Sequence, residues 1–284
     1  MREADETPPT RYVAVRGVRL AYTARGTGPV VLDAHGLSSS RAGARRFGLD
    51  FSPVADVGHT LISYDARGHG ESAGTDASAD YTWAALADDL LALADHFSPD
   101  APVSAIGSSM GTGTILHAVT LAPERFDRLV LTAPPTAWET RANQGAVYRQ
   151  LADLVESGGL EALARMSRQT PPAAIFADLP DFPPAPDVDA ALLPTIYRGA
   201  ADTDLPSLHL LAAITQPTMI LAWATDPGHP LSTAQKLAGV IAGSTLQVAE
   251  TSDAIRGWGR EAARFLAASP PGHSLNHPTL GHPL

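Results

Sequence analysis

The chain has 284 residues and a formal net charge of −10, from 30 acidic and 20 basic side chains. An acidic balance of this size argues against a nucleic-acid-binding surface, which is typically basic. Hydrophobic residues make up 44% of the chain, enough for a sizeable core, and the absence of cysteine excludes disulfides and cysteine-ligated metals.

Residues 1–10 are polar and acidic and lack the apolar stretch of a secretory signal. No apolar run approaches the ~18 residues that a membrane-spanning helix needs. We therefore expect a cytoplasmic protein with neither a membrane nor a nucleic-acid partner. The histidines show no ligand-like spacing with carboxylates and no glycine-rich nucleotide loop is found, so no metal or other cofactor is expected. The oligomeric state stays open.

The first half of the chain alternates short apolar runs with amphipathic stretches. Two β-prone runs, 11–16 and 18–24, predict an opening hairpin. Apolar residues recur every three or four positions over 81–97, which predicts a helix with one buried face. Further strands are expected at 30–34, 60–64, 102–107 and 128–132, and a further helix at 110–122.

The last part of the chain resumes this alternation, with strands predicted at 218–224 and 245–249 and helices at 231–242 and 252–268. Strands that alternate with helices predict an α/β fold, in which a mostly parallel sheet is flanked by helices on both faces. The predicted core comprises residues 11–135 and 216–268, and mobile tails are expected at 1–10 and 269–284.

Residues 136–215 interrupt the alternation. Helices are expected at 141–156 and 159–168, followed by an irregular, proline-rich stretch over 171–194. The segment enters just after the carboxyl end of a strand, where ligands bind in open α/β sheets. We therefore predict a helical cap over the active site rather than a passive insertion, and expect Trp138 and Tyr148 to line the substrate pocket.

Residues 107–111 read Gly-Ser-Ser-Met-Gly, a G-x-S-x-G pattern between a predicted strand and a predicted helix. This is the setting of a nucleophile elbow, in which a sharp turn exposes a serine hydroxyl. Ser109 is the candidate nucleophile, and Ser108 is expected only to fit the turn. The backbone amide of Met110 begins the helix, so it is a candidate oxyanion donor.

Two further motifs close predicted strands: His35-Gly36 after 30–34, and Asp-Ala-Arg-Gly-His-Gly-Glu-Ser at 65–72 after 60–64. With the elbow, and in this order, they resemble the α/β-hydrolase superfamily. The resemblance implies the α/β-hydrolase fold and a second oxyanion donor at the Leu37 amide. It implies that His35 lies at the pocket and braces its loop, and that Asp226, after the strand 218–224, is the acid of the triad. Glu139 and Asp202 are weaker candidates.

The catalytic base departs from the family pattern. In the family the histidine follows the last strand, but residues 250–256 contain none. His229 is the preferred substitute, because Asp-Pro-Gly-His at 226–229 predicts a type II turn that brings its first and fourth residues together. A histidine of the tail (His273, His277 or His282) and the absence of any base are the alternatives.

Three functions fit these residues. The first is a serine hydrolase of a small or medium ester, lactone or thioester, acting through an acyl-enzyme on a small-molecule carbonyl substrate. The second is a non-hydrolytic cyclase, lyase or isomerase of a biosynthetic pathway on the same fold, and the third is a degenerate binding protein. Whether an imidazole reaches Ser109 decides among them, because a serine hydroxyl is a weak nucleophile until a base takes its proton.

Overall fold

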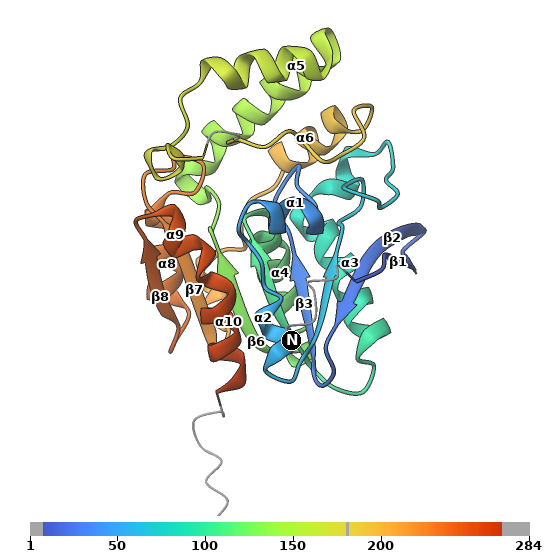
Figure 1. The fold of residues 1–284 in the computed structure, drawn as a ribbon, viewed down its shortest axis with the longest axis vertical. Coiled ribbons are helices and arrows are strands. Elements are labelled where there is room, and N and C mark those ends of the chain that lie inside the picture. Colours follow the sequence, from blue (N-terminus) through green and yellow to red (C-terminus); the bar gives the residue numbers. More distant parts are fainter. Residues whose placement is uncertain (1–7, 180–181, 269–284) are drawn as a thin grey trace, which may run out of the picture.

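The computed structural model describes residues 8–179 and 182–268 and is built on one eight-stranded sheet (Figure 1). The strand order is β1-β2-β4-β3-β5-β6-β7-β8. Strand β2 runs antiparallel to its neighbours β1 and β4, and every other neighbouring pair of strands in this sheet is parallel. The strands are β1 (Arg11–Val15), β2 (Val18–Arg25), β3 (Val30–Ala34), β4 (Thr60–Tyr64), β5 (Val103–Ser108), β6 (Phe126–Thr132), β7 (Thr218–Trp223) and β8 (Thr245–Ala249).

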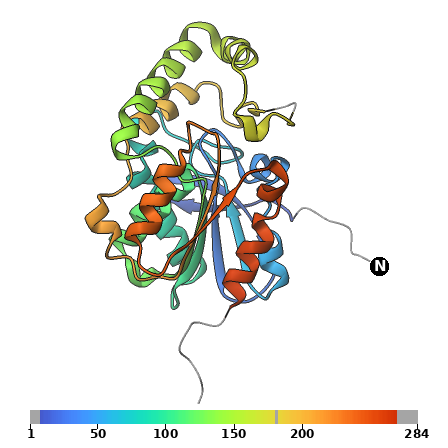
Figure 2. The same cartoon turned by 90° about the vertical axis from the view of Figure 1, so that its left-hand side faces the viewer.

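Helices cover both faces of this sheet, as Figure 2 shows edge-on. The α-helices are α1 (Arg41–Arg46), α2 (Pro53–Asp56), α3 (Trp83–Phe97), α4 (Met110–Leu121), α5 (Arg141–Gln169), α6 (Leu193–Ala201), α7 (Leu208–Leu211), α8 (Leu231–Val240), α9 (Ser252–Arg256) and α10 (Trp258–Ala267). Short 3₁₀ turns are η1 (Ser78–Tyr81), η2 (Pro123–Arg125), η3 (Trp138–Thr140) and η4 (Ala174–Phe176). The predicted fold class is confirmed.

Two apolar clusters hold the layers together. On one face, α3, α4 and α8 bury residues such as Leu90, Ile115 and Leu237 against the sheet. On the other, α2 and α10 bury residues such as Val54 and Trp258. The central strands β5 and β7 are buried along their whole length, which explains why they read as continuous apolar runs rather than as alternating patterns.

The register of the central strands brings the three sequence motifs to one edge of the sheet. Ala34, the last residue of β3, pairs with Tyr64 of β4 and with Gly107 of β5. The residues that follow these strands therefore emerge side by side at the carboxyl edge. Strands that are parallel and in register convert motifs far apart in the sequence into neighbours.

The segment 136–215, called the cap segment below, contains α5, α6 and the connections around them, and α5 and α6 lie above the carboxyl edge (Figure 1). Helix α5 is kinked at Gly159, whose φ of 63° is left-handed, and this kink separates the two helices that the sequence predicts. Not all of the segment is suspended over the site: Leu205, Leu211 and Ile214 pack into the core below, which ties its end to the sheet.

The predicted tails, 1–10 and 269–284, lie outside the described residues except for residues 8–10. Within the described ranges, no helix combines the length and the apolar composition that crossing a bilayer requires.

Candidate active site

Ser109 occupies a strained turn between β5 and α4. Its φ and ψ are 53° and −106°, which a residue with a side chain adopts at a free-energy cost. The two flanking glycines make the turn possible. A Cβ at Gly107 would lie 2.5 Å from the carbonyl carbon of Gly111, and a Cβ at Gly111 would collide with the carbonyl oxygen of Ala34. The G-x-S-x-G pattern is therefore a packing requirement of this turn.

Three predicted site residues are hydrogen-bonded in a row. The Oγ of Ser109 lies 2.7 Å from the Nε2 of His229, and the Nδ1 of His229 lies 2.7 Å from the Oδ2 of Asp226. The imidazole therefore stands between the hydroxyl and the carboxylate, with one ring nitrogen facing each. This is the geometric arrangement of a nucleophile, a base and the group that orients the base.

The Asp226–His229 turn differs in type from the prediction. The amide of His229 donates to the carbonyl of Asp226 at 3.1 Å, so the turn closes between its first and fourth residues as expected. Gly228, however, does not have the positive φ that a type II turn requires, so the type II prediction is wrong. Instead, the Gly228 amide donates to the Oδ1 of Asp226 at 2.8 Å, and this bond aims the carboxylate along the turn.

Trp223, the last residue of β7, fixes both members of this turn. Its indole N–H donates to the Oδ2 of Asp226 at 3.0 Å, and its ring meets the ring of His229 edge-on with centroids 5.1 Å apart. Trp223 was not predicted as a site residue. An indole three positions before a candidate acid was the only signal, and it does not reveal which way the ring points.

The local electrostatics keep Asp226 ionised. Burial alone would raise the pKa of its carboxyl, but the hydrogen bond and charge of His229, with the amide of Gly228 and the indole of Trp223, lower that pKa below its usual range. The carboxylate is 15% exposed and the imidazole 22% exposed, so solvent screens their attraction only in part. An ionised carboxylate holds the Nδ1–H tautomer and leaves Nε2 free to accept a proton.

The turn after β3 passes directly against the elbow. A Cβ at Gly36 would lie 3.5 Å from the Cβ of Ser109. Leu37 is the next residue, so its backbone amide lies beside the point where the turn approaches the elbow. His35 supports the turn from below. Its Nδ1–H donates to the Gly36 carbonyl at 2.8 Å, and its Nε2 accepts from the Ala66 amide at 3.0 Å.

Because both of its ring nitrogens are engaged and the side chain is 3% exposed, His35 braces the turn and offers no free atom to a substrate. Burial lowers the pKa of His35 to about 4, so the ring is neutral at physiological pH.

The two predicted cap residues lie in different places. Tyr148 of α5 packs against the same apolar cluster as Leu37 and stacks on Tyr197 with ring centroids 6.1 Å apart. Burial raises the pKa of Tyr148, the charge and hydrogen bond of Arg141 oppose that rise, and the charge of Asp226 adds to it. Trp138 instead donates its indole N–H to the carbonyl of Pro206 at 3.1 Å and packs against the core at the base of the cap segment.

The weaker acid candidates are engaged elsewhere in ion pairs. Glu139 pairs with Lys236 at 2.6 Å, and Asp202 pairs with Arg149 at 2.6 Å. Of the alternative bases, the histidines of the tail lie outside the described residues.

Comparisons with known proteins agree with this architecture. The family model for the alpha/beta hydrolase fold matches residues 29–171. An uncharacterized protein of Mycobacterium tuberculosis is 28% identical, with 87% of this chain and 76% of that protein covered. The 3-oxoadipate enol-lactonase 2 of Acinetobacter baylyi is 29% identical, with 68% of this chain and 71% of that enzyme covered.

Among solved structures, a hydrolase from Pseudomonas aeruginosa superimposes with a TM-score of 0.73 at 22% identity and covers 94% of this chain and 100% of its own. The enol-lactonase from Burkholderia xenovorans gives a TM-score of 0.70 at 20% identity and covers 91% of this chain and 100% of its own. Sequence motifs, sheet order, elbow and family match converge, and the chain belongs to the α/β-hydrolase fold family.

Proposed function

We propose that this protein is a serine hydrolase of small or medium esters, lactones or thioesters. The observation that carries the proposal is the 2.7 Å hydrogen bond between the Ser109 hydroxyl and the Nε2 of His229. A serine next to a base that is itself oriented by a carboxylate is the signature of nucleophilic acyl transfer. In this proposal His229 supplies the base from the turn after β7, so the site has a base although residues 250–256 contain no histidine.

The proposed reaction has two stages. As the Oγ of Ser109 attacks the substrate carbonyl carbon, its proton passes to the Nε2 of His229 and a tetrahedral oxyanion forms. The imidazolium then gives the proton to the departing alcohol, enol or thiol, leaving an acyl-enzyme. Water attacks the acyl carbon with His229 again taking a proton, and the acid is released as the proton returns to Ser109.

Asp226 acts through His229 in this scheme. Its ionised carboxylate fixes the tautomer and stabilises the imidazolium that forms in both stages. The amides of Met110, at the first position of α4, and of Leu37, beside the Gly36–Ser109 contact, are the proposed donors to the oxyanion. Such donors act where charge develops, and losing one typically lowers the rate by about 10²–10³.

The relatives support the reaction class rather than a particular substrate. The Acinetobacter baylyi protein is named an enol-lactonase, and a solved structure of similar fold is an esterase from Thermogutta terrifontis. The Ser109–His229 hydrogen bond supports hydrolysis over the alternatives, which are a non-hydrolytic enzyme with an altered triad and a degenerate binding protein. The cap, in which Tyr148 packs against the same apolar cluster as Leu37, is the part that we expect to select the acyl or alcohol group.

Reaction of the intact protein with a fluorophosphonate tests the proposal. Wild type should be labelled at Ser109, Ser109→Ala should not, and His229→Ala should be labelled slower by several orders of magnitude, as for other triads that lose the base. Ser108→Ala and His209→Ala are matched controls, since Ser108 bonds to Thr132 and His209 is exposed on α7. Folded wild-type protein that resists labelling would refute a serine hydrolase.

A further inference from the structure

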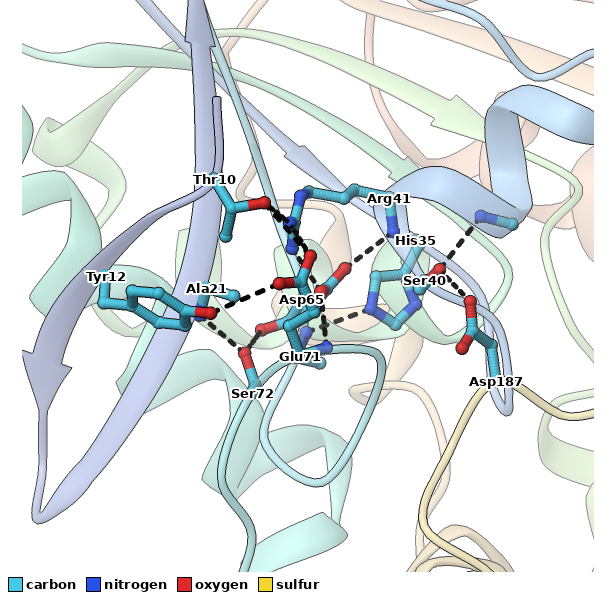
Figure 3. A network of polar contacts seen from close by, with 12 residues as sticks. Thr10, Tyr12, Ala21, His35, Ser40, Arg41, Asp65, Glu71, Ser72 and Asp187 are labelled. Carbon is cyan, nitrogen blue, oxygen red and sulfur yellow. Dashed lines mark hydrogen bonds and ion pairs between the residues drawn. The ribbon is translucent and has the colours of Figure 1, made fainter. Parts of the chain in front are cut away.

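One residue of the irregular part of the cap segment reaches the turn that follows β3. The Asp187 amide donates to the Ser38 carbonyl at 2.8 Å, and its carboxylate Oδ2 accepts from the Ser40 hydroxyl at 2.6 Å (Figure 3). Both partners lie within three residues of Leu37, the proposed oxyanion donor. A single cap residue thus contacts this turn through its backbone and through its side chain.

The turn needs such support, because part of it is strained. Ser38 has a φ of 56°, in the left-handed region that favours glycine. Locally, the turn is closed by the Ser39 amide, which donates to the Gly36 carbonyl at 3.2 Å. The hydrogen bond from the Asp187 amide to the Ser38 carbonyl adds a tie from outside the turn and fixes the peptide between Ser38 and Ser39, one residue beyond Leu37.

The Ser40 hydroxyl links this contact to α1. It accepts from the Gly43 amide at 2.9 Å, as the N-cap of that helix, and it spends its one proton on Asp187. A hydroxyl bonded to an ionised carboxylate makes a stronger hydrogen bond than one bonded to a neutral acceptor. Arg46, at 3.4 Å from the carboxylate and 70% exposed, contributes little by comparison.

Residues 187 and 188, which we call the strap, also contact the turn after β4. The Gly70 amide donates to the Asp187 carbonyl at 2.7 Å, and Val188 forms a β-bridge with His69. That turn is anchored in turn by Asp65, which accepts from the Arg41 amide at 2.8 Å, from the Arg41 guanidinium and from the Glu71 amide at 2.9 Å (Figure 3). The strap is therefore bonded to two turns at once: the Leu37 turn and the turn after β4, which the hydrogen bonds of Asp65 anchor.

We infer that Asp187 is a positioning residue for the oxyanion hole: through Ser38 and Ser40 it holds the turn that presents the Leu37 amide to the reacting carbonyl. The inference rests on the proposed function and extends it, because it makes the cap a supporting part of the catalytic machinery rather than only a selector of substrates. Asp187 contacts neither Ser109 nor His229, so we expect its replacement to leave the titration of the base unchanged.

The test compares three variants in hydrolysis of p-nitrophenyl acetate. Asp187→Ala removes the carboxylate, and Asp187→Asn keeps an acceptor oxygen without the charge. Asp189→Ala is the matched control, since this exposed carboxylate of the same segment bonds, among the described residues, to the Ala191 amide two residues on. Circular dichroism and thermal melting are recorded for each variant.

Oxyanion contacts exist only in the transition state, so their loss lowers kcat and leaves KM unchanged. We expect Asp187→Ala to lower kcat by about tenfold to 100-fold, the range in which small displacements of a catalytic group act. KM should change less than about twofold, and the acid limb of the pH–kcat profile, which reports the base, should stay in place. Asp187→Asn should fall in between, and Asp189→Ala should match wild type.

Two results would overturn the inference. One is a kcat for Asp187→Ala within twofold of wild type. The other is a loss of kcat accompanied by a shifted acid limb, which would place the effect at the base. If Asp187→Ala does not fold, Asp187→Asn decides by the same criteria. Labelling of wild-type Ser109 by a fluorophosphonate separates this inference from the proposed function. If wild type is not labelled, both the serine hydrolase and the role of Asp187 fail. If wild type is labelled, the serine hydrolase stands and the kinetics of the Asp187 variants alone decide the role of Asp187.

Discussion

Histidine 69 offers a direct test of how burial shapes the stability of this fold. Its side chain is fully buried, its Nδ1–H donates to the Arg67 carbonyl at 2.9 Å, and its Nε2 has no hydrogen-bond partner among the described residues. The ring lies 5.2 Å from that of His35. Burial lowers the pKa of His69 to about 3, and the neighbouring His35 adds to that effect.

The sign of the effect follows from this pKa. In the unfolded chain the imidazole takes up a proton near its ordinary pKa of 6.5, whereas in the folded protein it resists protonation down to about 3. The stability that the neutral ring contributes is therefore complete above pH 6.5 and is lost as the pH falls from 6.5 toward 3. At pH 5, which is 1.5 units below 6.5, the loss from this one residue is about 2 kcal/mol at about 1.4 kcal/mol per unit.

Replacing His69 by Phe keeps a ring in the site but removes the titration. We expect the variant to lose the hydrogen bond to Arg67 at every pH, which costs roughly 1 kcal/mol. Relative to wild type, its free energy of unfolding should then rise by about 2 kcal/mol between pH 7.5 and pH 5. Urea unfolding at constant ionic strength, at half-unit steps across this range, gives both quantities.

A second variant separates titration from packing. His69→Gln is polar and does not titrate, so it should start from a different stability at pH 7.5 but show the same rise relative to wild type. A difference between wild type and either variant that does not change with pH would refute the reasoning, because it would mean that the buried ring gains no proton on unfolding.

Further changes test the elbow and the acid. Gly111→Ala should destabilise the fold by about 2–3 kcal/mol or prevent folding, since its Cβ would collide with the Ala34 carbonyl; an unchanged urea midpoint would contradict the packing argument. Trp223→Phe removes one donor to Asp226, and kcat for p-nitrophenyl acetate should fall about tenfold, whereas equal rates would make the indole a packing residue only. Asp226→Asn should lower kcat by about 10⁴, because His229 loses its tautomer and its charge partner; a loss below tenfold would reassign the acid.

Much of the fold is predictable from local sequence because its motifs stand at strand ends. Continuous apolar runs predict β3, β4 and β5 to within a residue, and the motifs after them specify which edge of the sheet carries the chemistry. Separate helices are also predicted at 141–156 and 159–168, and the structure breaks α5 at Gly159, whose φ other residues rarely adopt.

The site was harder to predict where it depends on side-chain direction. A four-residue turn predicts that Asp226 and His229 lie close, but only the packed ring of Trp223 and the position of β7 beside β6 decide that the imidazole faces Ser109. The turn type was wrong because Gly after Pro permits a type II turn without requiring one. Asp187 lies in a stretch without periodicity, 147 positions from Ser40, so no local pattern indicates their contact.

Placing the acid and the base on one turn has a dynamic consequence. Residues 226–229 are tied by the His229 amide to the Asp226 carbonyl and by the Gly228 amide to the carboxylate, so the pair moves as one body. In the family pattern the histidine follows the last strand, which here is the exposed edge strand β8. Because His229 lies on the same turn as Asp226, we expect local motion of β8 to leave the acid and the base together. We therefore expect motion of this turn against the elbow to lengthen the bond between His229 and Ser109 while the Asp226–His229 bond persists, so that the nucleophile loses its base without a change in how that base is oriented.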